Sequence, residues 1–387
     1  MKRTWIVLGL GMALGVGGAF HSASAADAPA PTLEDRVKAL EEKAADAIQI
    51  SGFVDAYYSL NFGHPATPAA GPSVLYPGGN QGLRAFDTVA DSFQLSLAEL
   101  VIQKAPSATT PVGFRVDLDF GPTADIVAAT EPGGSETFKN VQQAYVTYVA
   151  PLGKGLTIDF GKFVTHMGNE VIESKDNWNY SRGLLFTWAI PFYHTGLRIS
   201  YPLADTLTVT LLGVNGWNNV TDNNAGKSVG AQIIFTGIPK VTFVQNAIWG
   251  NEAGGFRRDV YDTIVTLNLT DKFSLAANGD YGRDGGPGAS GGSQSSWYGV
   301  ALYGRYAFTD KTAMALRGEW YADPDGYTTG VVQTVGEITA TGEWKLANAL
   351  LTRLEYRRDW SNQTPFINGI SPSHAQDTLE LGVVYTF

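Results

Sequence analysis

Three residues that could bind a metal ion occur at helical spacing in one segment of the chain. His166, Glu170 and Glu173 are separated by four and three positions, so a helix would place them on one face. Imidazole and carboxylate groups are common ligands of divalent metals. Solvated side chains of a polar passage would have the same composition, and we favour this second interpretation. The sequence therefore predicts no metal site here.

Residues arranged for catalysis are equally sparse. Gly288-Ala-Ser-Gly-Gly292 has the spelling of a nucleophile elbow, but it lies in a Gly/Ser run without the strand and helix that strain the serine. Gly226-Lys-Ser228 ends like a phosphate loop, but Thr221 stands where the first glycine of that motif belongs. We therefore expect no enzyme activity and no cofactor.

The N-terminus indicates export from the cytoplasm. Lys2 and Arg3 precede an apolar run, and Ala23-Ser-Ala25 has the small residues of a cleavage site, so residues 1–25 are predicted to be a cleaved signal peptide. There are no cysteines, which excludes disulfides. Without Lys2 and Arg3, 25 basic residues oppose 37 acidic ones, a net charge of about −12. This balance disfavours nucleic-acid binding, which depends on Lys and Arg.

A short heptad pattern follows the cleavage site. Apolar residues recur from Leu33 to Ala47 at alternating spacings of four and three, with charged neighbours. This pattern predicts a short helix, either the stalk of a homotrimer or a monomeric lead into the next domain. The predicted domains are the signal peptide (1–25), a periplasmic linker with this helix (26–47) and a strand-rich domain (48–387).

From Ile48 onward, period-two alternation replaces the helical period. Near Glu99 the alternation changes phase, which indicates either a bulge or a wrong assignment. Sixteen strands are predicted, over residues 48–62, 93–104, 112–120, 138–150, 156–165, 194–202, 206–215, 228–237, 240–249, 257–270, 273–283, 294–308, 311–323, 332–345, 349–360 and 376–387.

The last predicted strand indicates how the sheet is completed. It alternates up to the terminal Phe387, and in a soluble protein such a strand would leave a long apolar edge open to aggregation. In a closed barrel the last strand pairs with the first, and the edge disappears. The alternation places Glu380 on the inner face and Leu381 on the outer face. We therefore predict an all-β fold, a transmembrane antiparallel β-barrel of about 16 strands with a short N-terminal helix.

The connections between the predicted strands alternate in length, as they do in outer-membrane barrels. An even strand count places both chain ends on the short-turn, periplasmic side. Short connections include 202–205, 238–239, 270–272, 309–310 and 346–348, and they alternate with long ones at 63–92, 121–137, 166–193, 216–227, 284–293, 324–331 and 361–375.

The third long loop, 166–193, is predicted to fold into the lumen, because aromatic side chains such as Phe186 and Trp188 would be costly in water. Its aromatic residues either wedge the loop against the wall, which we favour, or offer stacking surfaces for sugar rings: Trp178, Tyr180, Phe186 and Trp188. Its polar residues are predicted to form the pore constriction: His166, Glu170, Glu173, Lys175, Asp176 and Arg182.

Charged side chains of both signs are predicted on the lumen wall. An acidic excess there favours weak cation preference, although selectivity is decided at the narrowest point. The main predicted wall residues are Arg115, Asp117, Asp119, Arg198, Arg305, Arg317, Glu319, Arg353, Glu355 and Arg357.

Several segments resemble one known family. They are Ser51-Gly-Phe-Val-Asp-Ala-Tyr57, GKFVTH at 161–166 with FYHTG at 192–196, Tyr201-Pro202, Asn215-Gly-Trp-Asn218 and the terminal strand. With these segments the chain resembles the OmpL-like beta-barrel porins over most of its mature length. The resemblance implies a barrel in outer-membrane lipid that passes small hydrophilic solutes passively, without a cofactor. A solute-selective channel, for example for sugars, and a structural or adhesive barrel with a blocked lumen are the alternatives.

Overall fold

The computed structural model describes residues 32–34, 46–65, 79–107 and 109–387. The chain divides into two compact units, Met1–Ala44 and Ala45–Phe387, and the second contains the barrel. The predicted signal peptide, the linker and most of the predicted heptad helix lie outside the described residues, so they stay predictions.

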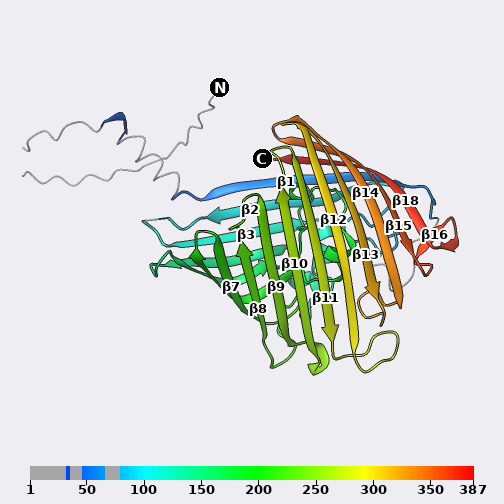
Figure 1. Cartoon of the computed structure of the whole chain (residues 1–387), viewed down its shortest axis with the longest axis horizontal. Coiled ribbons are helices and arrows are strands. Elements are labelled where there is room, and N and C mark those ends of the chain that lie inside the picture. The colour runs from blue at the N-terminus through cyan, green and yellow to red at the C-terminus, as the bar shows by residue number, and fades with distance from the viewer. Residues whose placement is uncertain (1–31, 35–45, 66–78, 108) are drawn as a thin grey trace, which may run out of the picture. The chain divides into compact units, whose positions relative to one another are not determined.

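Within the described residues, sixteen antiparallel strands form one closed barrel in which each strand pairs with its neighbours along the chain (Figure 1). All sixteen predicted strands are present. Their bounds are β1 Gln49–Asn61, β2 Ser92–Lys104, β3 Val112–Phe120, β4 Val141–Ala150, β5 Leu156–Val164, β6 Tyr193–Ala204, β7 Leu207–Val214, β8 Ser228–Phe235, β9 Val241–Asn251, β10 Arg257–Asn268, β11 Phe273–Asp284, β12 Ser295–Thr309, β13 Thr312–Asp323, β14 Gln333–Ala347, β15 Leu350–Ser361 and β18 Ala375–Thr386.

The first and last strands close the barrel, as the terminal alternation predicted. β1 and β18 pair from Phe53 opposite Thr386 to Asn61 opposite Thr378. Beyond this ladder, Gly52 N donates to the Phe387 carbonyl at 3.1 Å, and Phe387 N donates to the Gly52 carbonyl at 3.0 Å. The terminal residue is therefore part of the closure.

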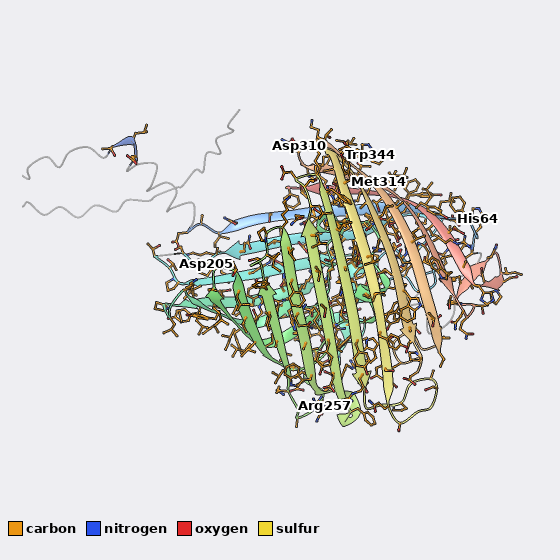
Figure 2. All side chains as sticks on the ribbon, viewed as in Figure 1. His64, Asp205, Arg257, Asp310, Met314 and Trp344 are labelled. Atoms are coloured by element: carbon orange, nitrogen blue, oxygen red, sulfur yellow. The ribbon has the colours of Figure 1, made fainter. Side chains whose placement is uncertain are left out.

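Side chains alternate between an inner face and an outer face along each strand, because successive residues of a strand point to opposite sides. On β18, Glu380 is buried inside the barrel, whereas Leu381 is 43% exposed on the outer face, in the phase predicted. Figure 2 labels Asp310 in the short turn between β12 and β13, near the outer-face residues Met314 and Trp344. Among the described residues, no helix is long and apolar enough to cross a membrane.

The predicted phase change of the second strand is a β-bulge. The pairing of β1 with β2 passes from Asp55 opposite Leu97 directly to Ala56 opposite Leu95, so Ser96 is the extra residue. The phase change was predicted near Glu99, and the bulge lies three positions before that residue. An extra residue reverses which side chains face outward, and this explains why the alternation breaks there.

Short helices and one small hairpin lie in the long loops. The fourth predicted strand begins at Val141 instead of residue 138, because the preceding residues form α3. The elements are α2 Pro122–Val127, α3 Ser135–Phe138, the 3-10 helices η1 Ser174–Asp176 and η2 Ala253–Gly255, α4 Leu184–Trp188, and the hairpin of β16 Phe366–Asn368 with β17 Ser371–Ser373. We name four loops by the residues between barrel strands: the first (62–91), second (121–140), third (165–192) and fourth (215–227).

If the outer face contacts lipid, Leu381→Arg should lower the free energy of unfolding by roughly 2–4 kcal/mol when the site lies near the middle of the bilayer. Leu381→Ala is the matched control, since it removes the side chain without adding a charge. Urea unfolding in lipid vesicles, followed by heat-modifiable gel migration, measures both variants. Equal stability of the two variants would mean that this face does not contact hydrocarbon.

Candidate functional site

The third loop packs against lumen-facing residues of the wall. The five residues of α4, Leu184–Trp188, are all buried. The four apolar ones belong to a core that also contains Phe86 of the first loop, Ile126 of α2 and wall residues such as Trp297. Burial of these side chains supplies the driving force for folding inward. Three loops therefore share one hydrophobic core within the lumen.

Three wall arginines hold the carbonyl groups of the third loop. Arg317 on β13 donates to the Ser181 carbonyl at 2.6 Å, and Arg357 on β15 donates to the Arg182 carbonyl at 2.7 Å. Arg353, also on β15, donates to the carbonyl of Asn177 at 2.6 Å and to that of Ser174. These hydrogen bonds satisfy loop carbonyls that have no strand partner.

Carboxylates of the wall accept the complementary N–H groups. Glu355 on β15 accepts from the backbone nitrogens of Tyr180 at 2.6 Å and Ser181 at 3.0 Å. Glu319 on β13 accepts from the backbone nitrogen of Leu184. Arginines and carboxylates alternate along β13 and β15, so these strands offer partners both to loop carbonyls and to loop N–H groups.

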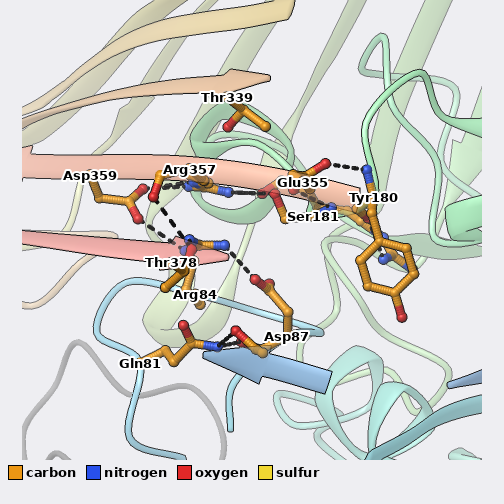
Figure 3. A network of polar contacts seen from close by, with 12 residues as sticks. Gln81, Arg84, Asp87, Tyr180, Ser181, Thr339, Glu355, Arg357, Asp359 and Thr378 are labelled. Carbon is orange, nitrogen blue, oxygen red and sulfur yellow. Dashed lines mark hydrogen bonds and ion pairs between the residues drawn. The ribbon is translucent and has the colours of Figure 1, made fainter. Parts of the chain in front are cut away.

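The first loop is joined to the same network. Arg84 donates to Asp359 on β15 at 3.0 Å and to the Thr378 hydroxyl on β18 at 2.8 Å, and it also pairs with Asp87 (Figure 3). Gln81 donates to the Asp87 carbonyl at 2.6 Å. The first loop and residues 174–184 of the third loop are therefore fastened to the wall from β13 through β15 and β18 to β1. The start of the third loop bonds elsewhere, since His166, Gly168 and Asn169 contact β8 to β11.

Two cavities lie on opposite sides of the third loop. The cavity on the short-turn side has a volume of about 380 Å³ and is bordered by lumen residues of β5 to β8, including Asp159, Arg198 and Gln232. The cavity on the long-loop side has a volume of about 320 Å³ and is bordered by long loops and by the loop ends of β10 and β12. Phe192, the last residue of the third loop, borders both cavities.

The six residues predicted to form the constriction have different surroundings. Glu170 and Arg182 are buried: Glu170 pairs with Arg317 at 2.7 Å, and the Arg182 guanidinium lies 4.6 Å from the Phe86 ring centre. Both side chains therefore fasten the loop, and Glu170 also borders the short-turn-side cavity. Their burial follows from the inward fold, which leaves loop carbonyls in need of donors.

The other four residues lie nearer to open space. Glu173 borders the short-turn-side cavity, as does His166, whose ring nitrogen Nε2 donates to the Ala247 carbonyl at 3.1 Å. Lys175 lies over the Phe53 ring at 5.3 Å and pairs with Asp176. Asp176 is the most exposed of the six predicted constriction residues. Among the described residues, no group of His, Asp or Glu side chains is arranged to hold a metal ion.

The predicted wall charges fall into two groups. Partly exposed pairs lie away from the third-loop contacts, such as Arg198 with Asp159 at 2.9 Å. These partly exposed pairs form the first group, which contains Arg115, Asp117, Arg198 and Arg305. Buried residues beneath the loop form the second group: Arg317, Glu319, Arg353, Glu355 and Arg357. Asp119 is buried, and neither oxygen of its carboxylate has a hydrogen-bond partner among the described residues.

The four predicted aromatic residues contact the protein on several sides. Tyr180 donates its hydroxyl to Asp55 on β1 at 2.7 Å, and the Trp188 indole donates to the Leu83 carbonyl at 3.2 Å. Phe186 packs against Phe192 with ring centres 5.5 Å apart. Trp178 is half-buried and meets Tyr303 edge-on. These contacts hold the loop in place.

Sequence reasoning missed three aromatic residues that border the long-loop-side cavity: Trp217, Trp297 and Tyr327. It also missed the first-loop residues Arg84 and Asp87. Trp297 had a usable signal, because the alternation of its strand places it on the inner face with Gly299 and Ala301. The other residues lie in loops, where no periodicity indicates direction.

A closed barrel of antiparallel strands, short turns on one side, and an inward loop fixed to a charged wall define the porin class of channel proteins. The sequence model of one porin family, described as "Putative beta-barrel porin-2, OmpL-like", matches residues 47–387. The chain belongs to this family, as the resemblance predicted, and the family and fold place it among outer-membrane channels. No curated protein sequence matches the chain.

Solved porin structures share the fold at low sequence identity. The anion-selective porin from Comamonas acidovorans has 10% identity and a TM-score of 0.61, covering 88% of this chain and 99% of that one. The outer membrane channel DcaP of Acinetobacter baumannii has 12% identity and a TM-score of 0.55, covering 88% and 97%. A trimer form of Vibrio cholerae OmpT has 11% identity and a TM-score of 0.55, covering 88% and 99%.

Arg317→Met should lower the free energy of unfolding by about 3–5 kcal/mol, because it leaves Glu170 buried without its cationic partner and Glu337 with Arg357 alone. The control is Arg305→Met, which breaks the partly exposed pair with Glu343 and should cost about 0–1 kcal/mol. Urea unfolding in detergent compares the two variants. A similar loss in both would contradict the anchoring role of Arg317.

Proposed function

We propose that the protein is an outer-membrane porin through which ions and small hydrophilic solutes diffuse passively. The observation that carries the proposal is the pair of cavities on the two sides of the third loop, with Phe192 bordering both. A solute moving along the barrel would pass from one cavity to the other beside this residue. We therefore place the constriction at Phe192, between the third loop and the wall formed by β5 to β8.

The short-turn-side cavity supports hydrophilic solutes without a strong preference for one charge. Its wall carries Asp159 and Arg198, which neutralise each other as an ion pair, and the hydroxyls of Ser200 and Thr210. Glu173 of the third loop adds an acidic group at the edge of this cavity. Hydroxyl and paired charged groups can replace part of the hydration shell of a passing solute.

The proposal includes export with a cleaved signal over 1–25, a linker and helix over 26–47, and insertion in outer-membrane lipid. The outer face of the barrel supports the last step, since Leu302 and Leu316 are 64% and 49% exposed there. Apolar side chains in such a position favour hydrocarbon over water. We extend the proposal to a homotrimer, for which the heptad pattern offers a stalk and the trimer form of OmpT a structural precedent.

Single-channel recording in planar bilayers tests the proposal. The purified protein should conduct in potassium chloride, and Phe192→Ala should raise the conductance because it widens the point where the two cavities meet. Phe160→Ala is the control: Phe160 is 68% exposed on the outer face of β5, so its removal should leave conductance unchanged. A protein that inserts without conducting would be a blocked barrel, and the porin proposal would fail.

The acidic group at the edge of the short-turn-side cavity should influence ion selectivity. Glu173→Gln removes a negative charge beside the proposed route, so the reversal potential in a salt gradient should shift toward anions. Asp205→Asn removes the same charge from an exposed short turn and should leave the reversal potential unchanged. Equal shifts would place the selectivity filter away from Glu173.

A further inference from the structure

The cavity on the long-loop side is built from five loops and the wall. The third and fourth loops supply half of its lining residues, and the second loop, Glu252 and the residues after β13 supply the other loop contacts. Its lining residues include Trp188, Phe192, Trp217, Asn219, Trp297 and Tyr327. Its volume of about 320 Å³ lies at the lower end of the range of small-molecule sites. A single ring fits this size.

Aromatic rings line one side of the cavity. The rings of Trp217 and Trp297 are perpendicular, with centres 6.3 Å apart. Trp297 is also parallel to Tyr327, with centres 5.5 Å apart. Grouped aromatic residues supply a large, rigid apolar surface with few rotatable bonds. A ligand that meets them needs at least one apolar face.

The two charged side chains at the cavity are both compensated by protein groups. Arg258 pairs with Asp284 at 2.9 Å and donates to the Tyr327 hydroxyl at 2.6 Å. Glu252 accepts from the backbone nitrogen of Trp217 at 3.1 Å and from the Ser228 hydroxyl at 3.2 Å. A charged ligand would have to displace these partners. The cavity therefore favours a neutral ligand.

Neutral polar groups complete the lining. Thr130, Thr187 and Thr328 contribute hydroxyls, and Asn219 and Asn223 contribute amides. Hydroxyl and amide groups both donate and accept hydrogen bonds, so they match a ligand whose rim carries hydroxyls. Some of these groups also bond within the protein, as Asn219 donates to Asn223 at 3.4 Å and Thr328 to Asp323 at 3.1 Å. An aromatic hydrocarbon would add no hydrogen bond to their remaining donor and acceptor positions.

Hydrogen bonds between loops fix the shape of the cavity. The Asn218 side-chain oxygen accepts from the backbone nitrogens of Phe192 at 2.7 Å and Tyr193 at 3.3 Å, which joins the fourth loop to the third. Glu131 of the second loop accepts from the backbone nitrogens of Val220 and Thr221, both at 2.8 Å. Burial raises the pKa of Glu131, but these hydrogen bonds outweigh it and hold the pKa below its usual range. A site fixed before binding loses less entropy when the ligand arrives.

We propose that the long-loop-side cavity binds a neutral sugar ring. A pyranose has an apolar C–H face for the aromatic residues and a rim of hydroxyls for the amides and threonines, and it carries no charge. The inference rests on the proposed porin function, since it makes the cavity the first contact of a solute entering from the long-loop side. The aromatic residues that contact the sugar are Trp217, Trp297 and Tyr327. They lie outside the third loop, whose aromatic residues the sequence offered as sugar-stacking surfaces.

Calorimetric titration of the purified full-length protein in detergent with glucose and maltose tests the inference. Binding should be saturable, and Trp217→Ala and Asn219→Leu should each weaken it by roughly tenfold or more. Trp344→Ala is the control, because Trp344 lies on the outer face of β14 and its removal should leave affinity unchanged. Gluconate, which has similar hydroxyls but is an open chain and carries a charge, should bind at least about tenfold more weakly than glucose.

Bilayer conductance of the same preparations separates this inference from the porin proposal. A protein that conducts but binds neither glucose nor maltose would overturn the sugar site alone, whereas a protein that does not conduct would overturn the porin function. Gluconate binding as tight as glucose binding would overturn the assignment to a neutral ligand. Unchanged sugar affinity in both Trp217→Ala and Asn219→Leu would place the binding elsewhere.

Discussion

The arrangement of the barrel depends on the need of an inward loop for hydrogen-bond partners. Backbone groups removed from water must be paired, and a loop without strand neighbours cannot pair them internally. Here the partners are side chains of the wall. Arginines donate hydrogen bonds to the loop carbonyls, and Glu355 and Glu319 accept hydrogen bonds from the loop N–H groups. Burial of apolar side chains drives the loop inward, and hydrogen bonds to charged wall residues fix its position.

This dependence changes the meaning of charge inside the barrel. Charges that face a lumen are commonly discussed as groups that attract or repel passing ions. In this protein, Arg317, Arg353 and Arg357 are buried beneath the third loop, so they contact carbonyls and carboxylates instead of solutes. A buried ion pair contributes little net stability, but removal of one partner is costly. The network therefore specifies one position of the loop more than it stabilises the fold.

Sequence reasoning predicted the barrel well because its signals are local. Period-two alternation identified each strand and placed Glu380 inside and Leu381 outside. The inward fold of the third loop followed from the cost of exposing Phe186 and Trp188 to water. The partners of the loop could not be predicted, since Ser174 and its acceptor Asp55 are 119 positions apart. For the same reason the alternation identified Arg317 and Arg198 as wall residues but could not separate the anchor from the residue beside a cavity.

Most of the ion pairs that fasten the loops lie on the sector of the wall from β13 to β1, and this asymmetry has a consequence for how such a protein can diversify. The sector from β13 to β1 is constrained by mutual contacts, so a substitution there requires compensating changes elsewhere. The lumen residues Ser200 of β6 and Thr210 of β7 border open space, and their hydroxyls bond to each other and not to a loop. Related barrels can therefore acquire different solute preferences through substitutions on β6 and β7, while the sector from β13 to β1 stays unchanged.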